Sequence, residues 1–396
     1  MFSPRTTPWP LVALFTSGYL APYLLPTTVG RLDSGLPLSA TQAGAVGSAL
    51  LLSSAAAGFL LASRVDGVGP RALARIGLVL AVLGYGGAAL SSSVPAVVVG
   101  ALAGGFGSGT ATTVAATGIA AQRDPHRTTT LGLLGVSALA GAVYLTVPHL
   151  GAGHGQPLAA IALTALAVWP LTGSLPLCTA APRSRREAPP LPHRRAGLTL
   201  AAALLCWSLV QNSLWGVSGR IGLAQAHLSE ATVGAVFAVA LGTGLLGVVA
   251  AGALGPRLGL ALPVGAGTVL IAGCTVLSAC AHDLTTFASG EIAWNTLYPI
   301  VLSYVIGLAA SLDPRGRWAV LVGSASSLGT AAGPLAGSVL SAEAGFPAMG
   351  AILAAGLLVI AIPMTAVAMG VGRRRLPVVE IPVETPVRHA YDTTAA

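Results

Sequence analysis

Charged residues are scarce in this sequence. Only 8% of the 396 residues are charged, and lysine is absent, so all 20 basic residues are arginine. A soluble domain has roughly 25% charged residues because its surface must be polar. With 54% hydrophobic residues, the chain cannot cover such a surface. Its composition excludes an ordinary soluble enzyme and indicates an integral membrane protein.

Groups that carry catalytic chemistry are also scarce. The four cysteines, Cys178, Cys206, Cys274 and Cys280, lack the spacing of metal ligands, so we expect free thiols, no metal and no cofactor. The sequence has no acid or histidine cluster typical of a membrane transferase, and no glycine-rich phosphate loop followed by lysine. We therefore do not expect an enzyme.

Long apolar stretches are abundant instead. Crossing a bilayer takes about 20 apolar helical residues. Twelve stretches meet this requirement, at about 9–30, 41–63, 72–93, 95–119, 128–149, 157–178, 198–219, 231–254, 259–281, 284–310, 317–340 and 347–371. A membrane β-barrel would show strands of alternating polarity about ten residues long. The sequence therefore predicts an all-α integral membrane protein with twelve transmembrane helices.

The arginines are distributed unevenly between the loops. If the N-terminus is cytoplasmic, 18 arginines lie on the cytoplasmic side and two, Arg31 and Arg220, on the outer side. The positive-inside rule then predicts that the N- and C-termini are cytoplasmic. We expect the protein to lie in the cell membrane. The arginines set topology and meet anionic lipid in this interpretation, so no nucleic-acid partner is needed. We interpret Arg31, Asp33 and Arg220 as solvated loop charges, with an outer gate pair between Arg220 and Asp33 as the alternative.

A basic, proline-rich segment divides the spans into six and six. We expect an N-terminal six-helix bundle at 1–178, a disordered cytoplasmic linker at 179–197, a C-terminal six-helix bundle at 198–372 and a disordered cytoplasmic tail at 373–396. We expect the chain to be a monomer in the lipid bilayer.

An internal repeat relates the two halves. The segment LSATQAGAV at 38–46 matches LSEATVGAV at 228–236, an offset of 190 residues, and each lies where the second helix of its half begins. Other matches at this offset are Gly69 with Gly259, Arg127 with Arg317, and Pro157 with Pro347. One offset that aligns equivalent loops indicates a duplicated six-helix unit, and an even number of helices inserts both copies in the same orientation.

With this repeat, the chain resembles a major facilitator superfamily transporter over about residues 5–375. In that family the loop between the second and third helices usually reads Gly-x-x-x-Asp-Arg-x-Gly-Arg-Arg, and residues 62–71 here keep Asp66, Gly69 and Arg71. Two six-helix pseudo-symmetric bundles are the fold that the resemblance implies. It also implies that these three residues help to close the cytoplasmic side, the alternative being ordinary loop charges that fix topology.

One ionisable residue lies well within a predicted span, namely Glu291. A charge facing lipid there would cost about 3 kcal/mol, so Glu291 must face a cavity, find a partner or be neutral. Burial disfavours the charged form of a carboxyl group, and a proton carrier needs this property. We interpret Glu291 as a proton-coupling residue, with a structural role or a partly wetted position near the outer mouth as the alternative.

Polar and aromatic residues are spaced to share helix faces. Glu291, Asn295 and Tyr298 follow i, i+4, i+7, and Trp207, Gln211, Trp215 and Ser218 share a face of the seventh predicted helix. The candidate substrate-binding residues are Tyr19, Tyr23, Thr113, Gln211, Asn212, Trp215, Trp294, Asn295 and Tyr298. The alternatives are hydrogen bonds between packed helices and, for Thr113, a bond to its own backbone.

These features together predict a secondary transporter that works by alternating access. The resemblance places the substrate between the two halves near the membrane midplane. A mostly apolar cavity with one acid suits a small amphiphilic or cationic organic molecule, and we expect its proton-coupled efflux. Proton-coupled uptake of a small organic solute is the alternative. A non-transporting membrane sensor on the same fold is another, because fold does not fix function.

Overall fold

The structure is a computed structural model that describes residues 8–177, 190–313 and 315–374. The predicted tail beyond residue 374 and most of the predicted linker lie outside these ranges. Within them, regular secondary structure is entirely helical. Ten described helices are long and apolar enough to cross a membrane.

The two halves contain the following elements. The first half comprises α1 (Trp9–Tyr23), α2 (Leu25–Gly35), α3 (Ala40–Leu61), α4 (Val65–Val68), α5 (Pro70–Leu90), α6 (Val94–Ala120), α7 (Pro125–Thr146), η1 (Val147–His149), α8 (Gly155–Val168) and η2 (Trp169–Ser174). The second comprises α9 (Arg194–Arg220), a π-helical segment η3 (Ile221–Gln225), α10 (Glu230–Leu254), η4 (Gly255–Leu258), α11 (Ala261–Ala279), α12 (Leu284–Ser311) and α13 (Arg317–Arg374).

Two elements differ from the simple helices that the sequence predicts. The first span is divided into α1 and α2 at Leu24, between Pro22 and Pro26, because proline lacks the N–H that a continuous helix requires. The last two spans form the single element α13, but Gly345 within it has a φ of 78° and separates two helices. Counted in this way, the described helices account for the twelve predicted spans.

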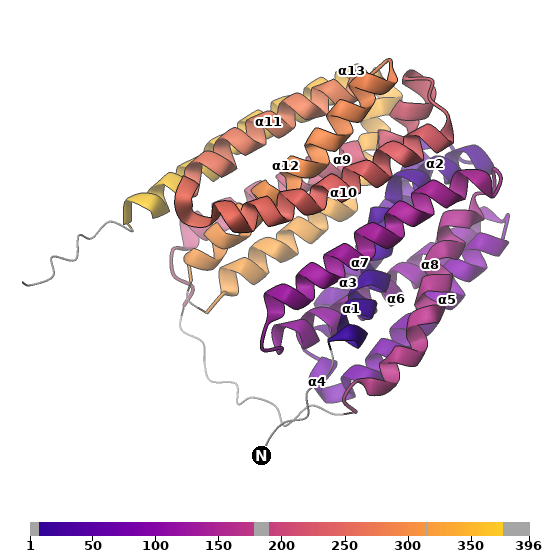
Figure 1. The fold of residues 1–396 in the computed structure, drawn as a ribbon, viewed down its shortest axis with the longest axis horizontal. Coiled ribbons are helices and arrows are strands. Elements are labelled where there is room, and N and C mark those ends of the chain that lie inside the picture. The colour runs from indigo at the N-terminus through magenta and orange to yellow at the C-terminus, as the bar shows by residue number, and fades with distance from the viewer. Residues whose placement is uncertain (1–7, 178–189, 314, 375–396) are drawn as a thin grey trace, which may run out of the picture.

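The helices run between two ends of the molecule. We call the end that carries loops 36–39, 150–154, 226–229 and 280–283 the distal end, and the end that carries loops 62–64 and 121–124 the proximal end. Figure 1 shows α4 at the proximal end and α2 at the distal end. The sequence-based topology would place the distal end outside the cell.

The internal repeat is visible in the helix caps. The Ser39 hydroxyl accepts a hydrogen bond from the Gln42 backbone N–H at the start of α3, and Ser229 accepts one from Thr232 at the start of α10. A serine at this position satisfies a helix N–H that has no partner within the helix. The matching segments of the repeat therefore begin the same helix in each half.

The two halves pack through glycines at equivalent positions. Gly44 on α3 meets Pro334 on α13, and Gly234 on α10 meets Tyr144 on α7. The two glycines are 190 residues apart, and so are Tyr144 and Pro334. A Cβ at Gly44 would lie 2.7 Å from the Pro334 carbonyl oxygen, and one at Gly234 would overlap the Tyr144 carbonyl oxygen. Because only glycine allows such close backbone approach, the duplicated sequence forms two equivalent contacts. Figure 1 shows α7 beside α10 at one of them.

Candidate functional site

A chain of aromatic rings connects α9 with α12. Trp207 stacks on Tyr298 with ring centroids 5.0 Å apart, Tyr298 lies 5.7 Å from Trp294, and Trp294 stacks on Trp215 at 5.6 Å. Helical spacing positions all four, because Trp207 and Trp215 lie two turns apart on α9 and Trp294 and Tyr298 one turn apart on α12. The structure thus brings three predicted substrate-binding residues together, and Trp207 joins them.

Two buried hydrogen-bond donors beside these rings have no acceptor in the part of the chain that the structure describes. The Trp294 indole N–H donates to Gln211 Oε1, which fixes the Gln211 amide. The Gln211 Nε2 and the Trp207 Nε1 are buried and have no acceptor among the described residues. Buried donors are nearly always paired, so each such donor calls for an explanation. An acceptor atom of a ligand, or a water molecule, could accept a hydrogen bond from each of these two donors.

The two asparagines are occupied within the protein. Asn212 Nδ2 donates to the Ser208 carbonyl at 2.9 Å and lies 3.2 Å from the Thr330 hydroxyl, which joins α9 to α13. Asn295 Nδ2 donates to the Glu291 carbonyl oxygen one turn earlier, at 3.0 Å. Both are half-buried, and their amide oxygens could still meet a ligand.

Tyrosines from both halves lie within electrostatic range of one another. Tyr298 on α12 interacts electrostatically with Tyr23 and Tyr19 on α1. Tyr19 is 37% exposed and contacts the Phe15 ring at a centroid distance of 4.5 Å, so part of its surface remains available. These three predicted residues therefore lie where the two halves meet.

The threonine predicted on the fourth helix has a local partner. Thr113 is 8% exposed, and its hydroxyl donates to the Gly109 carbonyl oxygen one turn earlier on α6 at 2.7 Å. Neighbouring Thr110 and Thr117 make equivalent bonds to α6 carbonyls. A bond of this kind to the helix's own backbone is the alternative to ligand contact for a threonine in a helix.

Glu291 lies inside the second half rather than at its surface. Its side chain is fully buried, Oε1 lies 2.9 Å from the Ser218 hydroxyl on α9, and Ser278 on α11 is next to the carboxyl group. Oε2 has no hydrogen-bond partner within the described part of the chain. The same Ser218 hydroxyl lies 3.0 Å from the Leu214 carbonyl oxygen. Ser278 was not foreseen, since a serine in an apolar span gives no signal by itself.

The three residues of the predicted gating motif lie at the proximal end. Gly69 has a φ of 97°, and a Cβ there would overlap the Leu177 carbonyl oxygen, so this turn requires glycine. Arg71 Nε donates to the Leu175 carbonyl oxygen at 2.8 Å, which ties α5 to the end of the sixth span in the same half. Asp66 is exposed on the short helix α4.

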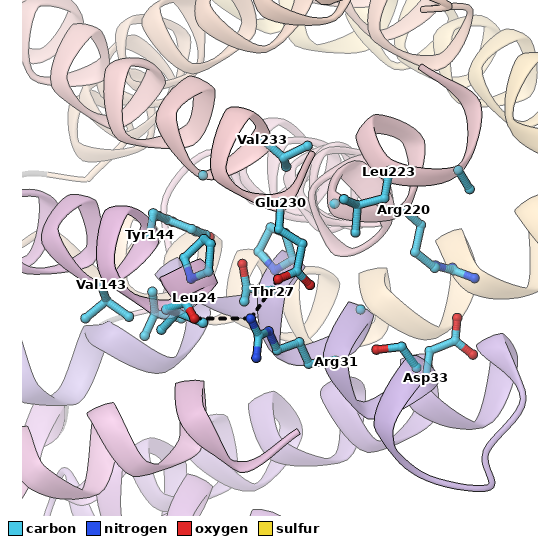
Figure 2. Close-up of a pocket in the computed structure, with 18 of the residues that line it drawn as sticks. Leu24, Thr27, Arg31, Asp33, Val143, Tyr144, Arg220, Leu223, Glu230 and Val233 are labelled. Carbon is cyan, nitrogen blue, oxygen red and sulfur yellow. Dashed lines mark hydrogen bonds and ion pairs between the residues drawn. The ribbon is translucent and has the colours of Figure 1, made fainter. Parts of the chain in front are cut away.

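The interpretation of Arg31 as a solvated loop charge is wrong. Arg31 belongs to α2 and is only 3% exposed, because its guanidinium donates to the carbonyl oxygens of Val147, Gly151 and Gly153 and to Gln156. It also forms a 2.8 Å ion pair with Glu230 on α10 of the other half, as Figure 2 shows. Glu230 is not among the residues predicted from the sequence as a partner of Arg31. The repeat contains a signal for it, because Glu230 occupies a position where the first copy has alanine.

Solved transporter structures resemble the chain over nearly its whole length. The human organic anion transporter MFSD10 is 18% identical with a TM-score of 0.67, covering 92% of this chain and 100% of that one. A POT family transporter in complex with 5-aminolevulinic acid is 13% identical with a TM-score of 0.72 (93% and 98%), and the nucleoside transporter NupG is 14% identical with a TM-score of 0.71 (91% and 99%).

No protein-family model matches the chain, and no curated protein matches it in sequence. The structural likeness, together with the apolar helices, shows a multi-pass membrane protein with the major facilitator fold, as the sequence predicts. At these identities the likeness shows the fold alone, since one fold can serve several functions.

Proposed function

We propose that the chain is a secondary active transporter that moves a small organic molecule by alternating access, with proton-coupled efflux as its reaction. The observation that carries this proposal is the asymmetry of the contacts between the halves. Hydrogen bonds that join the halves within the described ranges lie toward the distal end, between Arg31 and Glu230, Trp215 and Pro22, and Ser48 and Leu335. A protein that binds substrate between two halves and closes one end at a time would have this arrangement.

The transport site of this proposal lies between α1, α9 and α12. The tyrosines of α1 lie within electrostatic range of Tyr298 there. The donors of Trp207 and Gln211 that have no acceptor among the described residues also lie at this site. Aromatic faces bind the apolar part of a molecule, while buried donors bind an acceptor atom. The proposed substrate is therefore a small organic molecule with an aromatic or apolar body. The similar structures include an organic anion transporter, a nucleoside transporter and a transporter in complex with 5-aminolevulinic acid, and all of these ligands are small organic molecules.

Glu291 is the proposed proton site. The single Ser218 proton can be donated either to the Leu214 carbonyl or to Glu291, but not to both. When Glu291 is protonated, its carboxyl O–H can donate to Ser218 while Ser218 donates to Leu214. Protonation thus changes the hydrogen bonds of α9 within one turn of Trp215, whose indole N–H donates to the Pro22 carbonyl of the other half at 3.0 Å. A proton at Glu291 can in this way influence the contact between the halves.

The remaining parts of the proposal follow from the sequence-based topology. We place both termini in the cytoplasm and the protein in the cell membrane as a monomer. The distal end is then external, so the described state is closed to the outside, and Asp66, Gly69 and Arg71 belong to the cytoplasmic side that closes in the opposite state. Reaction of a single introduced cysteine within 179–197 with an external impermeant thiol reagent would refute this topology.

The test of transport uses purified protein in proteoliposomes. A panel of small organic cations, anions and amphiphiles is supplied with and without a pH gradient, and movement of compound and proton is recorded. The Glu291→Gln variant should bind substrate but lose the pH dependence of transport. Glu343→Gln, an exposed acid at the distal end, serves as the control and should resemble the wild type. Unchanged pH dependence in Glu291→Gln would exclude Glu291 as the proton site, and movement of no compound would favour a sensor.

A further inference from the structure

A pocket of about 380 Å³ lies between the two halves at the distal end, separate from the proposed transport site. Four charged residues line it. Arg31 and Asp33 come from α2 in the first half, and Arg220 on α9 and Glu230 on α10 come from the second (Figure 2). Each half therefore contributes one positive and one negative charge, and the pocket as a whole is neutral.

Only one of the two possible pairs is formed. Arg31 and Glu230 are 2.8 Å apart, and the two terminal nitrogens of Arg31 also bond to backbone carbonyls and to Gln156, so these nitrogens have little capacity left. Only the Arg31 Nε has no acceptor among the described residues. Asp33 and Arg220 interact electrostatically across the pocket. Neither has an opposite charge within 4.0 Å in the part of the chain that the structure describes.

Arg220 in particular is incompletely satisfied. Its Nη2 donates to the hydroxyls of Ser338 at 3.0 Å and Ser341 at 3.3 Å, both neutral acceptors. Its Nε is buried and has no acceptor among the residues described. A guanidinium prefers a carboxylate, which accepts two parallel hydrogen bonds from it. Arg220 therefore offers a site for a carboxylate, and Asp33 offers one for an ammonium group.

The rest of the pocket is mainly apolar, with Leu24, Val143, Leu223 and Val233 in its lining. We infer that this distal pocket binds a small zwitterion that carries a carboxylate, an ammonium group and an apolar substituent, such as an aliphatic amino acid. Its carboxylate would meet Arg220, its ammonium group Asp33, and its substituent the apolar lining.

Neutrality favours a zwitterion over a singly charged ligand. An anion alone would leave Asp33 unpaired beside a second negative charge, and a cation alone would do the same to Arg220, in a setting where unpaired charges are costly. The zwitterion pairs both charges and keeps the pocket neutral. Because Asp33 and Arg220 belong to different halves, the bound molecule also bridges them and should favour the closed distal end.

Calorimetric titration of the purified full-length protein in nanodiscs tests the ligand class. The probes are leucine, 4-methylpentanoate, which keeps the side chain and carboxylate, and 3-methylbutylamine, which keeps the side chain and amine. We expect saturable binding of leucine and at least about tenfold weaker binding of each analogue, since each loses one charge-assisted contact. Absence of saturable leucine binding, or equal affinity for an analogue, would overturn the inference.

Variants test the location. Asp33→Asn and Arg220→Gln should each weaken leucine binding roughly 10- to 100-fold, and Arg220→Lys, which keeps the charge but not the paired donors, should fall between Arg220→Gln and the wild type. Glu343→Gln is the matched control at the same end. Circular dichroism melting of each variant confirms that it is folded. Leucine binding that survives both pocket variants and disappears in Gln211→Leu would place the ligand in the transport site and overturn the inference. Because binding is measured without transport, the result does not depend on the proposed function.

Discussion

Replacing Gly234 with alanine is expected to open the distal end of the protein. The Cβ added to α10 would overlap the Tyr144 carbonyl oxygen on α7, and it would lie 3.2 Å from the Tyr144 carbonyl carbon. Both atoms belong to the backbone and cannot rotate away as a side chain could. The two helices, and with them the two halves, must therefore separate where they now make contact.

The size of the effect follows from the cost of overpacking. An added methyl group in a tightly packed contact costs about 1–3 kcal/mol, and about 1.4 kcal/mol corresponds to tenfold in an equilibrium. Alanine also favours a helix over glycine by about 1 kcal/mol, but this gain is the same in both states and cancels. We expect the ratio of closed to open protein at the distal end to fall roughly 5- to 150-fold.

Pulsed electron paramagnetic resonance measures this ratio directly. Spin labels at Leu150→Cys and Glu343→Cys, which are exposed distal positions on opposite halves, report their separation in a protein whose native cysteines are replaced by serine. Gly242→Ala is the matched control, because it lies on the same helix and a Cβ there has no described atom outside its own helix within 4 Å. Gly44→Ala, at the equivalent position in the repeat, should act like Gly234→Ala.

The expected result is a longer distance in Gly234→Ala and Gly44→Ala and an unchanged distance in Gly242→Ala. If all three variants have the distance distribution of the parent protein, close glycine packing does not hold the distal end closed, and the reasoning is refuted. If Gly242→Ala also opens the distal end, the effect does not come from the contact between the halves, and the reasoning is refuted as well.

Three further outcomes are expected. Glu230→Gln should open the distal end by less than Gly234→Ala, because Glu230 is 42% exposed and such a pair contributes at most about 1 kcal/mol; the same spin labels measure this. Ser229→Ala should lower the free energy of unfolding by about 1 kcal/mol through loss of the α10 cap, as denaturant unfolding would show. The bond from the Arg317 guanidinium holds the pKa of Asp313 below its usual value. The stabilisation that this bond gives to the start of α13 should therefore be present above about pH 4 and be lost as the pH falls through the lowered pKa. Hydrogen exchange at the first turn of α13 should detect this loss, and Asp313→Asn should abolish the pH dependence.

Much of the fold could be predicted because its signals are local. Long apolar runs predict spanning helices at any position in the chain. The repeated segments at 38–46 and 228–236 begin equivalent helices because each contains its own capping serine. The break between α1 and α2 could not be predicted from Pro22 and Pro26, because a kinked helix and a broken one have the same proline signal.

The candidate site was predicted only in part. Helical spacing places Trp207 and Trp215 on one face of α9 and Trp294 and Tyr298 one turn apart on α12, since one turn brings i and i+4 to the same face. The ring contacts between α9 and α12 are tertiary contacts, which spacing within one helix does not predict. Spacing could not reveal which polar atoms are already satisfied. Asn212 bonds across to α13, whereas Gln211 Nε2 has no acceptor in the described part of the chain, although the two amides are adjacent in the sequence.

The sequence by itself determined the membrane environment, the number of spans and the duplication, because scarcity of charge, apolar length and a constant offset are properties of the chain before it folds. Only the tertiary structure decided how the few remaining charges are used. Arg31 and Glu230 are 199 residues apart and form one ion pair, while Asp33 and Arg220 line a pocket and form no ion pair within the described residues. Such pairings depend on distances between helices of different halves, and no local pattern encodes those distances.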